Sequence, residues 1–407
     1  MVLGPIVLTT RTLGSTTGVS QAALDIALAL SQRSCELRVR SWVPKRLPTH
    51  LDGHTMGPWA AEPVSPLKAA RALLQREAPP RALLEHAREA GKGLGRDNTS
   101  RAAPVLEVVN GLGAHALWQA AARYPGVPSL LVVHESPRHF DEPGRLDLKA
   151  ALAALRCSHG WVFVSEGGQK AWQALAGLDP QRTYYVPNCV KEQRVESMFT
   201  HARTELRKRL GYDATQAVRA VCVGQVCARK GQDVLLAGLA AVPDSGAPIQ
   251  LDFLGDCSSS WARKLRRDLE GQFSPQLAQR VRFLGKVSDV YERVYAADVL
   301  LLGSRAEASP LVVLEAMALG TCVIAADVDG VSEQVVDEET GLLFHHGDTR
   351  ELAGSLSRVA RDPSLRERLA RGGRVRYLER YSRERQLARW GAILSEALQT
   401  RVSARPT

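Results

Sequence analysis

From about residue 218 the chain alternates short apolar runs with amphipathic, helix-like stretches. The apolar runs are AVCVG, LDFLGD, VRFLGK, DVLLLGS and CVIAADV, and a polar turn follows each of them. This alternation is typical of βα units arranged around a parallel sheet. Such sheets bind ligands beyond the carboxyl ends of their strands, so we expect the chemistry to lie in the turns after these runs.

The first half of the chain repeats this pattern less regularly, with the strand candidates IVLTTR, LRVRSWV, VLEVVN, SLLVVHE, GWVFVSE and TYYVPN. A length of 407 residues is more than one ordinary core needs. We therefore predict an α/β fold with two Rossmann-like, doubly wound domains, residues 1–190 and 191–380, which face each other across a cleft. Residues 381–407 are predicted to form a terminal helix, with an apolar stripe of Leu387, Trp390, Leu394 and Leu398.

Composition narrows the classes of protein. No apolar run approaches the roughly 18 residues of a membrane span, and the opening MVLGPIVLTT is unlike a signal peptide. The seven cysteines are scattered, with neither a CxxC pair nor a Cys/His metal spacing, which indicates reduced thiols in the cytoplasm. The net charge of +10 favours anionic partners. No nucleic-acid-binding motif accompanies that charge, so no nucleic acid is expected as a partner.

A basic segment, residues 63–101, interleaves leucines with lysines and arginines. It is either a pair of surface helices with solvated basic faces or an interfacial helix that rests on anionic lipid or an acidic acceptor. The second interpretation predicts a cytoplasmic protein that binds peripherally to the cytoplasmic face of the membrane.

The strongest motif is SRAEASPLVVLEAMALG, residues 304–320, directly after the run DVLLL. Ser309 suits the N-cap of a helix and Pro310 its first position. The free N–H groups of Leu311 and Val312 would then point into the crevice at the strand ends. A helix N-terminus in that place binds phosphate.

Two carboxylates belong to the same motif. Glu307 precedes the helix and Glu315 lies about two turns inside it, so that one can face a sugar while the other reaches a ribose diol. The alternative is that Glu315 is only a polar residue on a helix whose neighbours are core. A carboxylate in so apolar a helix needs partners, which favours the functional interpretation.

A second motif is VGQVCARKGQDVLL, residues 223–236, which again follows the order strand, turn and helix. Gly224 permits close approach of the backbone. Arg229 and Lys230 place cations at the same sheet edge as the helix near Ser309, an arrangement that suits a diphosphate leaving group. Basic residues in a turn are often simply solvated, and only the position at a strand end favours a role.

Two further candidates lie in the first half. Gly14 and Gly18 follow the first strand and precede a helix near Ser20, where glycine allows the backbone to meet a phosphate or a sugar, although the pattern is not GxGxxG. His134 and Glu135 end the strand SLLVVHE, from which a side chain would project into the cleft. A single histidine in such a position is as readily structural as functional.

On these residues the chain resembles the retaining nucleotide-sugar glycosyltransferases of family 4, which have the GT-B fold. The likeness is dense over residues 218–375 and thin in the first half. Its carriers are the E-x7-E spacing of Glu307 and Glu315, the VG…RKG turn, the FLG segments, ADVLLLGSRAEASP, TGLLFHHGD, Gly18, the HES from His134 and the VPN ending at Asn188.

The resemblance implies a nucleotide-sugar donor, with UDP or GDP, on the second domain and a glycan or lipid-linked acceptor on the first. It also implies a terminal helix that returns to the first domain, and neither metal nor other cofactor. Lys230 would hold the diphosphate, Glu315 the ribose and Glu307 the transferred hexose. His134 would contact that sugar near the anomeric carbon, and transfer would retain the anomeric configuration.

One position departs from the family pattern: Gln225 stands where an arginine is usual, directly after Gly224. Glutamine cannot supply a cationic, bidentate grip. Either Arg229 replaces that arginine, or the protein is a degenerate member that binds a nucleotide sugar or a partner transferase without turnover. A nucleotide-sugar epimerase or a sugar-phosphate synthase on the same fold is the alternative enzyme.

Overall fold

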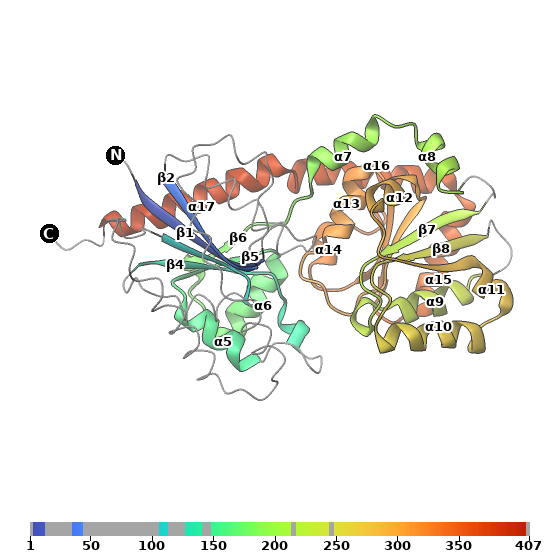
Figure 1. Cartoon of the computed structure of the whole chain (residues 1–407), viewed down its shortest axis with the longest axis horizontal. Coiled ribbons are helices and arrows are strands. Elements are labelled where there is room, and N and C mark those ends of the chain that lie inside the picture. Colours follow the sequence, from blue (N-terminus) through green and yellow to red (C-terminus); the bar gives the residue numbers. More distant parts are fainter. Residues whose placement is uncertain are drawn as a thin grey trace. The chain divides into compact units, whose positions relative to one another are not determined.

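The computed structural model describes residues 3–12, 35–43, 106–112, 127–140, 148–212, 217–243 and 248–403. Its contacts divide the chain into two compact units (Figure 1). The first unit comprises residues 1–187 and 386–407, and the second comprises residues 188–385. Gly18 and the basic segment 63–101 lie outside the described residues.

The first unit contains a six-stranded parallel sheet with the order β2-β1-β3-β4-β5-β6. The order reverses between β1 and β3, and such a reversal opens a crevice at the carboxyl ends of the strands. The strands are β1 (Leu3–Thr12), β2 (Cys35–Val43), β3 (Leu106–Asn110), β4 (Ser129–Val133), β5 (Gly160–Phe163) and β6 (Thr183–Tyr185).

Both faces of this sheet are covered. Leu131 and Phe163 pack on one face with Trp172, whereas Leu130 and Val132 pack on the other with Trp390. Burial on both faces explains why the strands read as continuous apolar runs. The helical elements of this unit are η3 (Pro137–Phe140), α5 (Leu148–Cys157), α6 (Glu166–Ala176), η4 (Pro180–Arg182) and α17 (Arg383–Ser403).

The terminal helix α17 packs on the first sheet through the predicted apolar stripe. Trp390 and Leu394 are buried there, and Leu387 is partly buried against them. Ile393 joins this cluster although the stripe did not include it. The side chain of Leu398 lies outside the described part of the chain.

The second unit has a six-stranded parallel sheet with the order β12-β11-β10-β7-β8-β9, in which the order reverses between β7 and β10. Every predicted strand of this half is present. Strand β12 was not predicted, because its run LLFH is too short to give a clear pattern. The strands are β7 (Val218–Val223), β8 (Ile249–Leu254), β9 (Val281–Gly285), β10 (Val299–Leu302), β11 (Cys322–Asp327) and β12 (Leu342–His345).

Helices cover both faces of the second sheet (Figure 1). The helix that starts at Leu311 is buried from Val312 to Leu319 except at Glu315, which is partly buried. The helices are α7 (Glu192–Phe199), α8 (Arg203–Arg209), η5 (Ala228–Lys230), α9 (Gln232–Ala240), α10 (Ser260–Gln272), α11 (Pro275–Arg280), α12 (Val290–Ala296), α13 (Leu311–Leu319), α14 (Val331–Gln334), α15 (Thr349–Arg361) and α16 (Pro363–Arg380).

Among the described helices, none is both long enough and apolar enough to cross a membrane. The six cysteines whose side chains are described are free thiols, and Cys189, Cys222 and Cys322 are buried.

Candidate functional site

Two turns meet where the order of the second sheet reverses. One follows β7 and the other follows β10, and glycine permits their close approach. Gly231 has a φ of 62°, and a Cβ at that position would stand 1.8 Å from the carbonyl oxygen of Gly303. Gly224 has a φ of 145°, and a Cβ at Gly255, in the turn after β8, would lie 2.0 Å from the Gly224 oxygen, so a third turn packs against the first. Backbone contacts therefore fix the two turns against each other.

Glu307 joins these two turns through its side chain. Its Oε1 atom accepts from Lys230 Nζ at 2.5 Å and from Arg229 Nη1 at 3.2 Å. The hydroxyl of Ser304 donates to the same atom at 2.8 Å. Arg229 Nη1 also donates to the carbonyl oxygen of Ala306 at 3.0 Å, so it contacts both the backbone and the carboxylate of the turn after β10.

The charges of this cluster keep Glu307 ionised. Burial by itself raises the pKa of the Glu307 carboxyl, but the charges of Lys230 and Arg229 and the hydrogen bonds outweigh it, and the pKa lies below its ordinary value. Two cations against one carboxylate leave a net charge of +1. An anionic group that enters beside them gains charge-assisted hydrogen bonds.

The predicted helix cap at Ser309 is wrong. Helix α13 begins at Leu311 with Pro310 as its N-cap, and no side chain caps it. Pro310 has an extended ψ of 117°, which places it outside the helix. The hydroxyl of Ser309 instead accepts from Gln334 Nε2 at 3.0 Å, and the Ser309 carbonyl accepts from Asn188 Nδ2 at 3.1 Å.

The N-terminus of α13 still offers the free backbone N–H groups that led to the prediction of a phosphate site. The N–H groups of Leu311, Val312 and Val313 belong to the first turn, which has no intrahelical acceptors for them. They lie directly after the turn of Glu307. A helix N-terminus at a strand-order reversal is suited to a phosphate.

Glu315 has a partner that the sequence pattern does not reveal. The hydroxyl of Tyr291, on α12, donates to Glu315 Oε1 at 2.9 Å. Burial raises the pKa of the Glu315 carboxyl to about 7, against the opposing effects of Tyr291, Lys191 and Arg194. The group is therefore poised between its neutral and ionised forms near neutral pH.

Gln225 extends from the turn after Gly224 with an exposed side chain. Its backbone oxygen accepts from Gln232 Nε2 at 3.1 Å, which anchors the turn. Arg229, the predicted substitute for the usual arginine, bonds Glu307 and Ala306 instead. Its Nε atom is buried and has no hydrogen-bond partner among the described residues.

In the first unit, His134 follows β4 at its carboxyl end, as predicted. Its Nε2 atom and Asn110 Oδ1 are 2.8 Å apart. Burial lowers the pKa of His134 to about 4, so the ring is neutral near pH 7. Because an amide oxygen only accepts, Nε2 carries the proton and Nδ1 is the unprotonated nitrogen.

Sequence reasoning missed three of these residues. Asn110 ends β3 and Ser304 follows β10. Each is a polar residue at the carboxyl end of an apolar run, which is a pattern that the sequence shows. Tyr291 belongs to another helix and offers no such pattern. Across the described parts of both units, no group of three or more His, Cys, Asp or Glu residues is arranged to hold a metal ion.

These features define a class of protein. Two parallel α/β units of this kind constitute the GT-B fold of glycosyltransferases. The crystal structure of HepE from Anabaena, in complex with UDP-glucose, has this architecture with a TM-score of 0.73 and 21% identity. The superposition covers 96% of this chain and 99% of HepE.

The family is matched over the second unit. Residues 217–362 match the model of a family described as glycosyl transferases group 1, and they include Gly224, Lys230, Glu307 and Glu315. The second unit is thus similar to group 1 glycosyltransferases over these residues.

Two curated relatives extend the likeness. Alpha-D-kanosaminyltransferase of Streptomyces kanamyceticus is 27% identical over 269 residues, 62% of this chain and 68% of the relative. D-inositol 3-phosphate glycosyltransferase of Actinosynnema mirum is 37% identical over 221 residues, 52% of this chain and 51% of the relative. The chain spans about half the length of several such relatives.

Proposed function

We propose that the protein is a retaining, metal-independent glycosyltransferase. It would move a hexose-type sugar from a UDP- or GDP-sugar to a hydroxyl of a glycan or lipid-linked acceptor. The observation that carries this proposal is the cluster of Glu307, Lys230 and Arg229, which lies at the strand-order reversal and directly before the N-terminus of α13.

The donor would lie along this edge of the second sheet. Lys230, Arg229 and the first-turn N–H groups of α13 would take the diphosphate, because together they offer two cations and several oriented dipoles. Glu315 would accept from the ribose hydroxyls. The group 1 family match over this unit and the UDP-glucose bound to HepE support this assignment.

Glu307 can hold the cations and the sugar at once. All described hydrogen bonds to its side chain end on Oε1, and Oε2 receives none within the described part of the chain. A carboxylate oxygen accepts more than one hydrogen bond. Oε2 is therefore free to accept from a hydroxyl of the transferred sugar while Oε1 keeps Lys230 in place.

Catalysis would be electrostatic. As the bond between the sugar and the diphosphate breaks, negative charge grows on the leaving group, where Lys230, Arg229 and α13 stabilise it. The acceptor hydroxyl would attack on the face from which the diphosphate leaves, through an oxocarbenium-like transition state. No protein nucleophile is required. His134, as a neutral ring, would contact the sugar through Nδ1, and this remains a prediction.

One observation favours a second candidate, a protein that binds nucleotide sugars without turnover. The exposed Gln225 stands in place of a cation, and Arg229 does not point out of the Glu307 cluster to replace it. Weakened stabilisation of the leaving diphosphate would lower turnover more than binding.

Two experiments decide between these candidates. A thermal-shift screen of UDP, GDP and their hexose conjugates identifies the donor, since a ligand of the native state raises the melting temperature. The donor is then incubated with candidate acceptors, with and without EDTA, and the anomeric configuration of the product is read by NMR. Binding without transfer or hydrolysis would support the second candidate, and loss of activity in EDTA would exclude metal independence.

The acceptor side is tested separately. If residues 63–101 meet a lipid-linked acceptor, the protein should bind anionic vesicles at low salt. Reversing Lys68, Arg71 and Arg76 to Glu should abolish that binding, because each cation near the surface contributes about 1 kcal/mol. Donor affinity should not change. A wild type that ignores such vesicles would favour a soluble glycan acceptor instead.

A further inference from the structure

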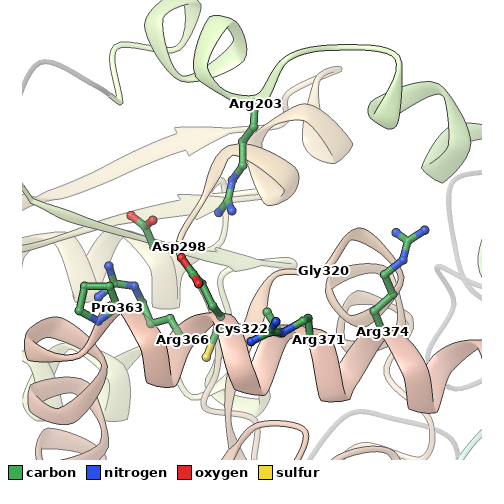
Figure 2. A pocket seen from close by; sticks show the side chains of 10 residues that line it. Arg203, Asp298, Gly320, Cys322, Pro363, Arg366, Arg371 and Arg374 are labelled. Carbon is green, nitrogen blue, oxygen red and sulfur yellow. The ribbon is translucent and has the colours of Figure 1, made fainter.

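A pocket of about 340 Å³ lies at the opposite edge of the second sheet (Figure 2). Asp298, directly before β10, and Cys322, the first residue of β11, line it, so it is at the amino ends of strands whose carboxyl ends carry Glu307. Arg203 reaches into this region from α8, and α16 carries Arg366, Arg371 and Arg374 along it (Figure 2).

The lining of this pocket is predominantly cationic. Four arginines face two acidic residues, Asp298 and Glu367. Asp298 is already engaged, because Arg207 Nη1 lies 3.2 Å from one carboxylate oxygen and the N–H of Arg219 donates to the other at 2.8 Å. Burial raises the pKa of the Cys322 thiol to about 12, so that it adds no negative charge.

The pocket arginines are held by groups that do not neutralise them. Arg203 donates to the carbonyl oxygen of Ala297 and Arg366 to that of Val359. Arg374 donates to Ala318 at 2.9 Å, and its guanidinium lies 4.1 Å from the centroid of the Phe199 ring. None of the four forms an ion pair with a carboxylate of the described residues. By contrast, carboxylates pair with Arg207, Arg282, Arg293, Arg305 and Arg358.

Arg203 shows the cost of this arrangement. Burial lowers the pKa of its guanidinium, and the charges of Arg207 and Arg366 lower it further, although Asp298 opposes them. Its Nε atom is buried without a hydrogen-bond partner among the described residues. A cation in such a position gains both charge compensation and hydrogen bonds when an anion enters.

We propose that this pocket is a second anion site, separate from the donor site, and that it binds a phosphate-bearing ligand. The planar fork of arginine matches phosphate oxygens in pairs, which makes arginine the preferred residue for such groups. The volume is at the lower end of the range of about 300–1,000 Å³ for small-molecule sites, so it admits a phosphate ester or diphosphate.

The test measures the melting temperature of the full chain with two probes, inorganic phosphate and pyrophosphate. Chloride at the same ionic strength is the control. Both probes should raise the melting temperature of the chain whose pocket is intact. The double variant Arg366→Gln with Arg371→Gln should lose this shift. Arg267→Gln, which removes an exposed cation of α10 outside the pocket, should keep it. All of these shifts are measured in the Lys230→Ala background, which weakens phosphate binding at the proposed donor site, so that the remaining shift reports on this pocket.

A second measurement does not depend on the folding of the variants. Phenylglyoxal modifies accessible arginines, and peptide mapping of the wild type should show that phosphate protects Arg366 and Arg371 while chloride does not. Equal shifts with and without the double substitution, or no protection of these arginines, would overturn the proposal. The failure would leave the proposed transfer reaction unaffected, because that reaction depends on Glu307 and Lys230.

The phosphate can come from a soluble ligand or from a lipid headgroup. Flotation with phosphatidylglycerol vesicles distinguishes the two sources. Vesicle binding that the double variant loses, and that soluble phosphate competes with, would assign the site to a headgroup. A response to phosphate and pyrophosphate alone would assign it to a soluble ligand. Independence from Arg366 and Arg371 in both arms would refute the site.

Discussion

The turn after β10 and the helix α13 that follows it each carry one buried or partly buried carboxylate, and the two behave in opposite ways. Burial acts to raise the pKa of both Glu307 and Glu315. Glu307 has Lys230 and Arg229 beside it and its pKa is lowered, whereas Glu315 has a neutral phenol and its pKa rises to about 7. The kind of partner, and not the depth of burial, therefore decides whether each carboxylate is charged.

The largest effect is expected from Glu307→Gln. The amide keeps the size of the side chain but removes the charge that orients Lys230 and the sugar. We expect sugar transfer to fall by about 100-fold or more, the scale observed when one electrostatic group of a transition state is removed. Turnover of the purified variant measures this, with circular dichroism as the control for folding. Near-normal turnover would remove Glu307 from the mechanism.

Lys230→Ala is expected to have the next largest effect, on binding. Within the nucleotide, Lys230 would contact only the phosphates. Affinity for a nucleoside diphosphate should therefore fall by roughly 10- to 100-fold, because a charge-assisted hydrogen bond contributes about 1.5–3 kcal/mol. Affinity for the nucleoside should change little. Calorimetric titration of both ligands provides the measurement. An equal loss for both would assign Lys230 a structural role.

Glu315→Gln tests the other half of the comparison. The folded state binds this proton more tightly than the unfolded state, so wild-type stability contains a term that falls as pH rises from about 4.5 to 7. Each unit of pKa difference corresponds to about 1.4 kcal/mol. The glutamine variant should lack this term, so its stability relative to wild type should increase across that pH range. Urea unfolding at pH 5 and pH 8 measures the difference, and a constant difference would contradict the raised pKa.

Tyr291→Phe should give the smallest effect. It removes one hydrogen bond to Glu315, worth about 1 kcal/mol, and that hydrogen bond opposes the rise of the pKa. The midpoint of the pH dependence of nucleotide binding should therefore move upward by less than about one unit. Titrating affinity against pH in both proteins tests this. A downward shift would mean that the phenol stabilises the protonated form of Glu315.

The fold was largely predictable because buried parallel strands leave a strong trace in a sequence. Runs such as AVCVG and DVLLL located β7 and β10, and the turns after them located Lys230 and Glu307. The contact between these two residues was not predicted, since residue types alone do not say that a cation intended for phosphate also pairs with the carboxylate. Strand β12, of four residues, left too short a trace.

The helix cap was predicted wrongly at Ser309, and the contact of Tyr291 with Glu315 was not predicted. Both depend on tertiary contacts. Ser309 is a suitable cap by residue type, but Gln334, from a helix further along the chain, donates to its hydroxyl. Tyr291 reaches Glu315 from α12, and no local spacing connects them. Gly18 and residues 63–101 lie outside the described residues and stay predictions.

The packing of α17 on the first sheet has a consequence for biosynthesis. Trp390, Ile393 and Leu394 complete a core with Ile6 and Leu8. A ribosome makes roughly 5–20 residues per second, so the strands that wait for α17 are exposed for about ten seconds or more while the second unit is synthesised. During that interval one apolar face of the sheet has no cover from its own helix. The second unit can fold first, and nascent chains shortened before Trp390 would present that face to chaperones or to one another.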